Sequence, residues 1–411
     1  MSNIAIVGGC GRLGLNLALI AANKGHNVTA IDIDDERINE IKQGNLPFVK
    51  EQAELYLEEA LKNKKLTLST EYDQVANAEV IVITMGTPVD SNLNPSLEPV
   101  AGVIFDLSEH FKKNQLIVFR NAIAPTVTNR IKTLIEDKTG FKVGKDIHLV
   151  FAPELAEENG NLHDLNKAAQ PIGAFDENSF RAAQKFFDTI TKGQITWLSP
   201  EEALLAKLMT NMFAYIQGAC ANEFYLIAQS FNANINKILD ATSNALPAPN
   251  PNNAGPGMHK EGWSLVERLP FAELVTTAFK INESMPAQIV KQLENHSLKK
   301  VAILGMTNKA NYDDARSSLS YKLRKMLFYK DYEVVCYDPY LPEFADSAVL
   351  QNTDAVILMT AHDEFSNLEK VKGWINNSNC VFVDIHGYWQ ELRNQSANQA
   401  HANESVKARK K

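Results

Sequence analysis

Along the first 150 residues, short apolar runs alternate with longer segments whose apolar residues recur at helical spacing. The apolar runs predict buried strands, and the periodic segments predict amphipathic helices. The predicted strands cover residues 4–7, 28–31, 80–84, 116–119 and 147–151, and the predicted helices cover residues 15–21, 51–63, 96–111 and 125–137. Alternation of this kind is typical of a parallel sheet with helices on both faces.

A glycine-rich turn joins the first predicted strand to the first helix, and Asp32 ends the second strand. The turn consists of Gly9, Cys10, Gly11, Arg12, Leu13 and Gly14. Glycines permit a tight turn and the close approach of a pyrophosphate to a helix N-terminus, and an acid at this distance binds ribose hydroxyls. The arrangement predicts a dinucleotide site in a Rossmann-like, doubly wound domain.

Charged residues near Asp32 bear on the choice of dinucleotide. Asp34 and Asp35 would repel the 2′-phosphate of NADP, which favours NAD as the cofactor. Arg37 lies close by and weakens this inference, because an arginine can accept that phosphate.

A second α/β unit is predicted in the last quarter of the chain, without the glycine pattern of the first. Its strands are expected at residues 301–305, 334–337, 355–359 and 381–384, with a helix at 317–328. Because the glycine pattern is missing, we expect this unit to bind a different ligand.

Between the two units the sequence predicts one long helix over residues 199–230. Ser199 and Glu202 form a capping box around Pro200, and about 31 residues at about 1.5 Å each would span about 46 Å. A narrow polar stripe runs along its mostly apolar surface. It consists of Lys207, Asn211, Gly218 and Asn222, and it is either a solvated stripe or part of an active site.

A segment rich in proline, asparagine and glycine, residues 246–262, follows the long helix. A long loop in a compact protein is usually functional or disordered. Helical segments are expected again over residues 265–293.

Composition narrows the class of partner. The 411 residues suffice for two or three domains, and a net charge of -8 argues against a general nucleic-acid binder. The four cysteines are far apart without a CxxC pair, so neither a metal site nor a disulfide framework is predicted. The sequence shows no signal peptide or apolar run of membrane-spanning length, which leads us to expect a cytoplasmic protein with a small-molecule partner.

The order of the motifs resembles the UDP-glucose/GDP-mannose dehydrogenase family, whose members oxidise nucleotide sugars with NAD. The motifs are GCGRLG at 9–14, TPVD at 87–90, APELAEENG at 152–160, GMTNKANYDDARSS at 305–318, YDP at 337–339 and TAHDEF at 360–365. The resemblance implies a UDP-sugar substrate, a homodimer formed through the central helix, and a role in making polysaccharide or glycoconjugate precursors.

The resemblance also implies a division into domains. Residues 1–198 would form an NAD-binding Rossmann domain, 199–296 a helical dimerisation domain and 297–393 an α/β domain for the nucleotide sugar, followed by a disordered tail at 394–411. The expected fold class is therefore α/β, with two doubly wound parallel-sheet domains joined by a long central helix.

Matching the family motifs residue by residue implies three groups of site residues. The catalytic residues would be Lys207, Asn211, Glu154 and Glu158. Besides the glycine-rich turn and Asp32, the cofactor would contact Arg37, Thr87, Pro88 and Arg316. The substrate would contact Leu155, Ala156, Gly257, His259, Lys260 and Lys309. A cation and an amide at positions 207 and 211 can both point at one developing oxyanion, which suits such chemistry.

The chain differs from the family at the residues that a second oxidation would require. Members that oxidise an alcohol to an acid carry a cysteine in the glycine-rich loop, followed closely by an aspartate, and a threonine after the fourth strand. Here the loop at 255–262 contains no cysteine, and Ala122 replaces the threonine. A thiolate is what traps the aldehyde for a second oxidation.

We therefore hypothesise a two-electron oxidation, in which His259 or Glu261 of the altered loop acts as the general base. Two alternatives remain open: a four-electron dehydrogenase with a substitute nucleophile, and a non-catalytic relative that only binds NAD and nucleotide sugar.

Overall fold

The chain folds into two compact units. The computed structural model describes residues 1–48, 52–85, 97–155, 162, 167–243, 245–253, 258–266, 268–269, 271–294 and 296–389, and for residues 258–260 and 263 it describes the backbone alone. The first unit comprises residues 1–211 with 260–268, and the second comprises residues 212–259 with 269–411. The division at residues 198, 296 and 393 stays a prediction.

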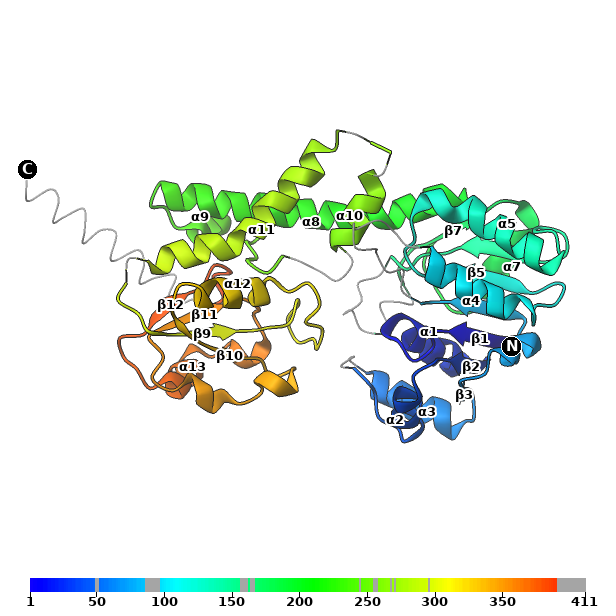
Figure 1. Cartoon of the computed structure of the whole chain (residues 1–411), viewed down its shortest axis with the longest axis horizontal. Coiled ribbons are helices and arrows are strands. Elements are labelled where there is room, and N and C mark those ends of the chain that lie inside the picture. The colour runs from blue at the N-terminus through cyan, green and yellow to red at the C-terminus, as the bar shows by residue number, and fades with distance from the viewer. Residues whose placement is uncertain are drawn as a thin grey trace, which may run out of the picture. The chain divides into compact units, whose positions relative to one another are not determined.

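The first unit is built on an eight-stranded sheet of order β3-β2-β1-β4-β5-β6-β7-β8 (Figure 1). The strands are β1 (Asn3–Val7), β2 (Asn27–Ile31), β3 (Leu66–Ser69), β4 (Val80–Ile83), β5 (Leu116–Phe119), β6 (His148–Phe151), β7 (Gln170–Ala174) and β8 (Ile195–Leu198). Neighbours are parallel except β6 and β7. The chain winds outward from β1 to β3, then returns to β4 on the other side of β1, so a ligand site is expected where β1 and β4 end.

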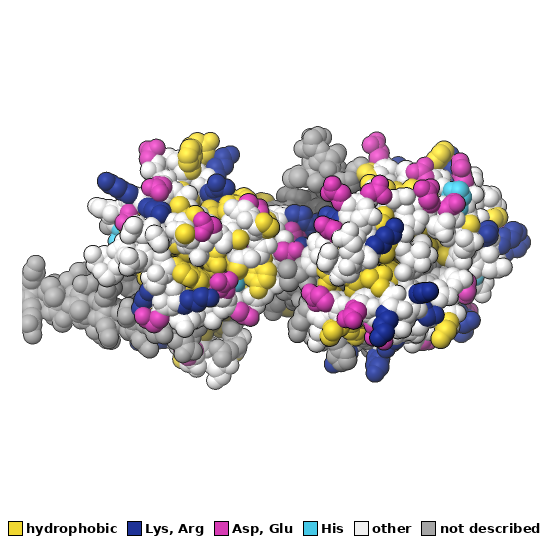
Figure 2. Space-filling view, turned by 90° about the horizontal axis from the view of Figure 1, so that it is seen from below, with side chains coloured by type: hydrophobic (Ala, Val, Ile, Leu, Met, Phe, Trp, Pro, Cys, Tyr) yellow, Lys and Arg dark blue, Asp and Glu magenta, His cyan; other side chains and the backbone are white. Residues whose placement is uncertain are grey.

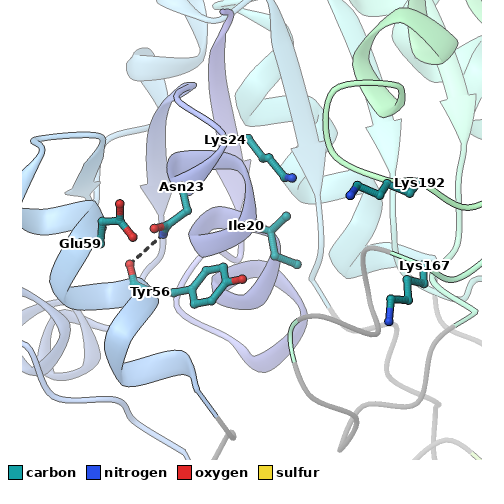
Figure 3. A pocket seen from close by; sticks show the side chains of 7 residues that line it. All are labelled: Ile20, Asn23, Lys24, Tyr56, Glu59, Lys167 and Lys192. Carbon is teal, nitrogen blue, oxygen red and sulfur yellow. Dashed lines mark hydrogen bonds between the residues drawn. The ribbon is translucent and has the colours of Figure 1, made fainter.

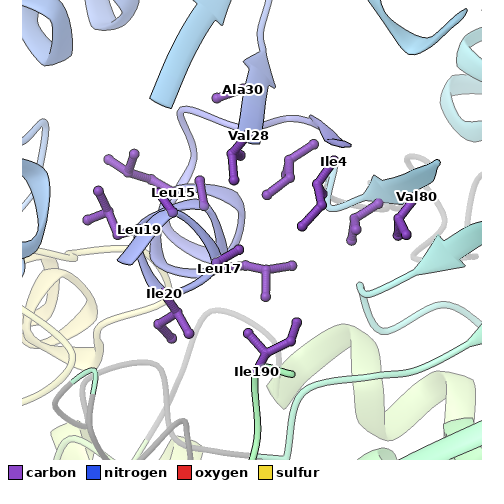
Figure 4. Packing of buried hydrophobic residues seen from close by; sticks show 14 of the residues in the cluster. Ile4, Leu15, Leu17, Leu19, Ile20, Val28, Ala30, Val80 and Ile190 are labelled. Carbon is purple, nitrogen blue, oxygen red and sulfur yellow. The ribbon is translucent and has the colours of Figure 1, made fainter. Parts of the chain in front are cut away.

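Each central strand is buried on both faces. In β1, Ile4 and Ile6 belong to one hydrophobic core, whereas Ala5 and Val7 belong to the other. The first core is completed by α1 (Arg12–Asn23), α2 (Asp35–Lys42), α3 (Ala53–Lys62) and α7 (Glu177–Phe187), and part of it is shown in Figure 4. The second core is completed by α4 (Glu98–Ser108), α5 (Thr128–Thr139) and Leu204. This two-sided burial explains why uninterrupted apolar runs predicted these strands correctly.

Three strands of this sheet were not predicted from the sequence. The edge strands β3 and β8 have only four residues each, and neither is fully buried. Strand β7 contains Pro171 and Gly173, two residues that usually argue against a strand interior. These strands depend on pairing with their neighbours rather than on a strong local pattern.

The second unit contains a four-stranded parallel sheet of order β10-β9-β11-β12. The strands are β9 (Lys300–Leu304), β10 (Glu333–Tyr337), β11 (Ala355–Leu358) and β12 (Val381–Val383), and all four were predicted to within two residues. One face packs against α11 (Glu273–Leu293) and α12 (Leu319–Phe328), and the other packs against α13 (Leu368–Ile375). The predicted α/β class with parallel sheets is confirmed.

Two shorter helices are α9 (Ile235–Ala241) and α10 (Met258–Val266). Among the described residues there is no helix with the length and apolar character needed to cross a bilayer. Figure 2 shows acidic and basic side chains interspersed over the face that it presents of each unit. A continuous basic surface is therefore not seen on this face.

The predicted long helix is confirmed as α8 (Pro200–Ser230), which has 31 residues. Its capping box forms as expected: Glu202 N donates to Ser199 Oγ at 3.2 Å, and Ser199 N donates to Glu202 Oε2 at 2.8 Å. Hydrogen bonds from the Ser199 backbone and side chain lower the pKa of the exposed Glu202. The start of α8 is thus fixed by residues within its own first turn.

Replacing Ser199 with alanine should therefore destabilise the first unit by about 1 kcal/mol, because the Glu202 amide loses its acceptor. Urea denaturation followed by circular dichroism measures this change. The control is Ser230→Ala at the other end of the same helix, where the exposed hydroxyl donates only to Ile227 O. Equal effects of the two substitutions would show that the capping box does not stabilise α8.

Candidate active site

The turn between β1 and α1 is held by backbone hydrogen bonds and by close packing. Gly8 N and Gly9 N both donate to Ile31 O, at 2.9 and 3.0 Å. A Cβ atom at Gly14 would lie 2.2 Å from Gly8 O, so this glycine is required by the fold itself. Among the described residues, a Cβ atom at Gly11 would meet Gly8 O alone, at 3.4 Å. The fold therefore leaves space beside Gly11 that packing does not need.

The N-terminus of α1 offers hydrogen-bond donors to an anion. Gly11 is its N-cap, no side chain caps the helix, and its first turn contains no acidic residue. The first backbone N–H groups of a helix and its dipole together favour a negative charge at this end. Gly11 and the uncapped helix end thus fit the pyrophosphate of a dinucleotide.

Asp32 is fixed at the end of β2 beside this turn. Its Oδ2 accepts from Cys10 N at 2.9 Å, and its Oδ1 accepts from Asp34 N at 3.3 Å. Arg37, which could have received a 2′-phosphate, is instead paired with Asp34 at 3.2 Å. The carboxylates in this corner favour a ribose with free hydroxyls.

The thiol of Cys10, in the glycine-rich turn, is expected to be unreactive. Burial, and to a smaller extent the charge of Asp32, raise the pKa of the Cys10 thiol to about 12. Burial likewise raises the pKa of Cys336 to about 11 and that of Cys380 to about 12. A thiol with such a pKa stays protonated at neutral pH and is a poor nucleophile.

A buried ion pair lies at the ends of β5 and β6. Arg120 Nη2 is 3.3 Å from Glu154 Oε2, and the two side chains are 8% and 12% exposed. Arg120 Nη1 also donates to Ala152 O at 2.9 Å and to Gln170 Oε1. Burial lowers the pKa of Arg120, and the charge of Glu154 opposes this shift. The arginine therefore fixes the position of the predicted catalytic acid.

Asn121, two residues after the end of β5, was not among the predicted site residues. It is 5% exposed, and neither its side-chain nitrogen nor its oxygen has a hydrogen-bond partner in the described part of the chain. Leaving both ends of a buried amide unpaired is costly, so Asn121 needs a partner that the described residues do not supply, such as a water molecule or a bound ligand. The signal available in the sequence was its position directly after β5, two residues from the strand end.

The predicted pair on α8 meets a carboxylate from a distant segment. Asn211 Nδ2 donates to Glu261 Oε2 at 2.6 Å, and Lys207 lies one helical turn before Asn211. Glu261, carried by α10, is 9% exposed and has no other hydrogen-bond partner among the described residues. An amide, a lysine and a nearly buried carboxylate therefore belong to one part of the first unit.

The rest of the polar stripe on α8 is structural. A Cβ atom at Gly218 would lie 2.1 Å from Asn253 Nδ2, so the asparagine packs against the bare backbone. Asn222 is fully buried, donates to Asn250 O and accepts from Asn250 N, both at 2.9 Å. The second half of the stripe thus anchors residues 250–253 rather than forming a reactive site.

In the second unit, polar residues gather where β9, β10 and β11 end. Asp338 accepts from Thr307 N at 2.9 Å and pairs with His362 Nε2 at 3.1 Å, and both side chains are fully buried. Burial raises the pKa of Asp338, but His362 and backbone N–H groups lower it by more. Asn252 joins the same edge by donating to Thr360 Oγ1 at 2.9 Å. Hydrogen bonds among these buried side chains hold together the segments that follow β9, β10 and β11.

Lys309 and Arg316 lie in the segment after β9. Lys309 is half-buried, whereas Arg316 is exposed and pairs with both oxygens of Asp314, at 2.9 and 3.0 Å from its Nε. Both residues belong to the second unit, and their roles toward substrate and cofactor stay predictions.

Several predicted site residues are not described. Thr87, Pro88, Ala156, Glu158 and Gly257 lie outside the described residues, and for His259 and Lys260 only the backbone in α10 is described. Leu155 is described and is half-buried beside Glu154. No group of acidic, histidine or cysteine side chains suited to a metal ion occurs within the described ranges.

Two models of one family match most of the chain. Residues 2–191 match the NAD-binding domain of the UDP-glucose/GDP-mannose dehydrogenase family, and residues 302–391 match its UDP-binding domain. The chain belongs to the UDP-glucose/GDP-mannose dehydrogenase family. The prediction of NAD as the cofactor is confirmed by this match.

Individual relatives cover nearly the whole chain. The UDP-N-acetyl-D-mannosamine dehydrogenase of Methanocaldococcus jannaschii is 29% identical, over 88% of this chain and 86% of the relative. The UDP-glucose 6-dehydrogenase of Rickettsia felis is 26% identical, over 89% of this chain and 88% of the relative. The solved structure of the UDP-D-ManNAc dehydrogenase from Pyrococcus horikoshii superposes with a TM-score of 0.86 at 27% identity, covering 93% of this chain and 96% of that one.

The two glycines of the turn should separate folding from cofactor binding. Gly11→Ala should keep the fold but weaken NAD binding at least about tenfold, because its methyl group enters the space left for the pyrophosphate. Gly14→Ala should also lower the melting temperature, because its Cβ overlaps Gly8 O. Fluorescence titration with NAD and thermal unfolding measure both effects. NAD binding that survives in Gly11→Ala would contradict this site.

Proposed function

We propose that this protein is an NAD-dependent oxidoreductase that oxidises one CH–OH group of a UDP-sugar to a carbonyl by a two-electron reaction. The family match supports the NAD and UDP-sugar classes. The finer claim, a single oxidation, is supported by the residues beside the predicted catalytic pair. The hydrogen bond between Asn211 and Glu261 is the observation that carries it.

Glu261 is proposed as the general base. Its carboxylate is nearly buried and has no ion-pair partner among the described residues. Burying an unpaired carboxylate costs free energy of folding, so such a group is expected where a function requires it. Asn211 fixes one of its oxygens at 2.6 Å and leaves the other available to a substrate hydroxyl. His259 and Glu261 were both open from the sequence, and this contact favours Glu261.

The reaction balances with these groups. Oxidation of the alcohol breaks its C–H and O–H bonds, sends a hydride to the cofactor and gives the hydroxyl proton to Glu261. NAD supplies the hydride acceptor when it is bound at the turn after β1. Lys207 and the amide of Asn211 stabilise the negative charge that grows on the oxygen. Arg120 keeps Glu154 in place, and Asn121 offers its unpaired amide to the bound ligands.

A second oxidation would need a nucleophile that this site does not provide. The aldehyde must be trapped covalently before another hydride can leave, and a cysteine thiolate usually does so. The loop at 255–262 contains no cysteine, and burial keeps the thiols of Cys10, Cys336 and Cys380 protonated. The fourth cysteine, Cys220, lies nine residues after Asn211 on α8, a distance of about 14 Å along the helix. We therefore expect the oxidation of the sugar to stop after the first hydride transfer.

The substrate class follows from the second unit and from the relatives. We propose that the segment after β9, which carries Lys309 and lies at the strand ends shaped by Thr307, Asp338 and Thr360, holds the nucleoside diphosphate. The relatives' names make UDP-N-acetylhexosamines the first sugars to test and UDP-glucose the second. We expect NADH to form with at least one UDP-sugar of this panel. Binding of NAD and UDP-sugar without NADH would overturn the proposed enzyme.

Glu261→Gln should lower kcat by about a hundredfold or more, since general-base catalysis contributes at least about this factor, with a small change in KM. Glutamine keeps an oxygen for Asn211 but cannot accept the proton. The matched control is Glu273→Gln on α11, which removes an exposed carboxylate. A kcat for Glu261→Gln within twofold of the parent would rule out this residue as the base.

We also propose a homodimer formed through α8. Phe213 and Ile227 on α8 are 63% and 48% exposed, and their separation of 14 residues, close to four helical turns, places them on nearly the same face. Phe231, which directly follows the last residue of α8, is 78% exposed. Exposed apolar side chains on one helix face favour burial against a partner.

Phe213→Asp with Phe231→Asp should convert the dimer to a monomer, because burying two carboxylates against an apolar face is unfavourable. Light scattering after size exclusion measures the mass. Phe328→Asp on α12, where the parent side chain is 69% exposed, is the control and should stay dimeric. A monomeric parent protein would disprove the proposal.

A further inference from the structure

A separate pocket lies at the far end of α1 in the first unit. It has a volume of about 390 Å³, within the range of small-molecule sites, and it is shown in Figure 3. It is lined by Ile20, Asn23, Lys24, Tyr56, Glu59, Lys167 and Lys192. Asn23 is 11 residues from Arg12 along α1, a distance of about 17 Å, so this pocket is not the phosphate turn.

Three chain segments bring ammonium groups to this pocket. Lys24 follows α1, Lys167 precedes β7, and Lys192 precedes β8. Within the described ranges none of them forms an ion pair, and among the described lining residues Glu59 is the only acid. Figure 3 shows the side chains of Lys24 and Lys192 extended toward each other. The lining is cationic in a chain whose net charge is -8.

The floor of the pocket is suited to an organic group. Ile20 is 4% exposed, and Tyr56 lies beside it (Figure 3). Asn23 donates through its Nδ2 to Tyr56 O at 2.8 Å, which ties the end of α1 to α3 at the pocket.

We propose that this pocket binds a small organic phosphate, a phosphate ester, at a site separate from the NAD and UDP-sugar sites. The phosphate lies between the ammonium groups of Lys24 and Lys192, with Lys167 as a third cation. The organic part lies on Ile20 and the ring of Tyr56. The negative charge of the phosphate balances the ammonium groups that the single carboxylate of Glu59 leaves uncompensated.

The test is calorimetric titration of the full chain, saturated with NAD and UDP so that both family sites are occupied. The probes are glucose 6-phosphate and inorganic phosphate. We expect saturable binding of glucose 6-phosphate, weakening as salt is raised, and weaker binding of inorganic phosphate, which lacks the organic contacts. Equal binding of the two probes would overturn the organic-phosphate assignment, and absence of binding would overturn the site.

Two double variants locate the binding. Lys24→Ala with Lys192→Ala should weaken glucose 6-phosphate binding at least about tenfold, since charge-assisted hydrogen bonds are lost. Both side chains are exposed, so the fold should be kept. The control, Lys112→Ala with Lys145→Ala, removes the same charge from exposed positions of the same unit and should bind as the parent does. Equal weakening in both variants would show nonspecific attraction and overturn the proposal.

Discussion

The direction of the strands is the constraint on which the functional residues depend. Parallel neighbours end at one edge of a sheet, so residues that are far apart in the chain meet there without any local sequence signal. In the first unit this edge collects Asp32, Asn121 and Glu154 from the ends of β2, β5 and β6. In the second unit it collects Asp338 and Thr360. The covering helices add the uncapped N-terminus of α1 to the first edge.

Features that depend on neighbouring residues were predictable from the sequence. The capping box of Ser199 and the buried strands are local, so pattern and spacing sufficed. The contact of Asn211 with Glu261 joins residues 50 positions apart, and the pairing of Arg120 with Glu154 joins residues 34 apart. Such pairs arise from tertiary packing, which periodicity does not encode. The polar stripe on α8 was therefore predicted as one unit, although its second half is structural.

The proposed two-electron reaction would keep one half of a four-electron oxidation and lose the other. Hydride removal needs a cofactor turn, an oxyanion site and a base, and the turn, Lys207, Asn211 and Glu261 provide groups of these kinds. Trapping an aldehyde needs an exposed thiolate, whereas burial raises the pKa of Cys10 and Cys336. A carboxylate in the altered loop suits proton transfer. Under the proposed function, the altered loop would change the chemistry while the family fold is kept.

The number of hydrides removed from each sugar tests this account most directly. A single turnover, with enzyme in excess over UDP-sugar and NAD in excess over both, gives this number as the yield of NADH per sugar, and mass spectrometry identifies the product. The account predicts one NADH and an aldehyde or ketone. Two NADH and a carboxylate would contradict it and would require a nucleophile other than the buried thiols.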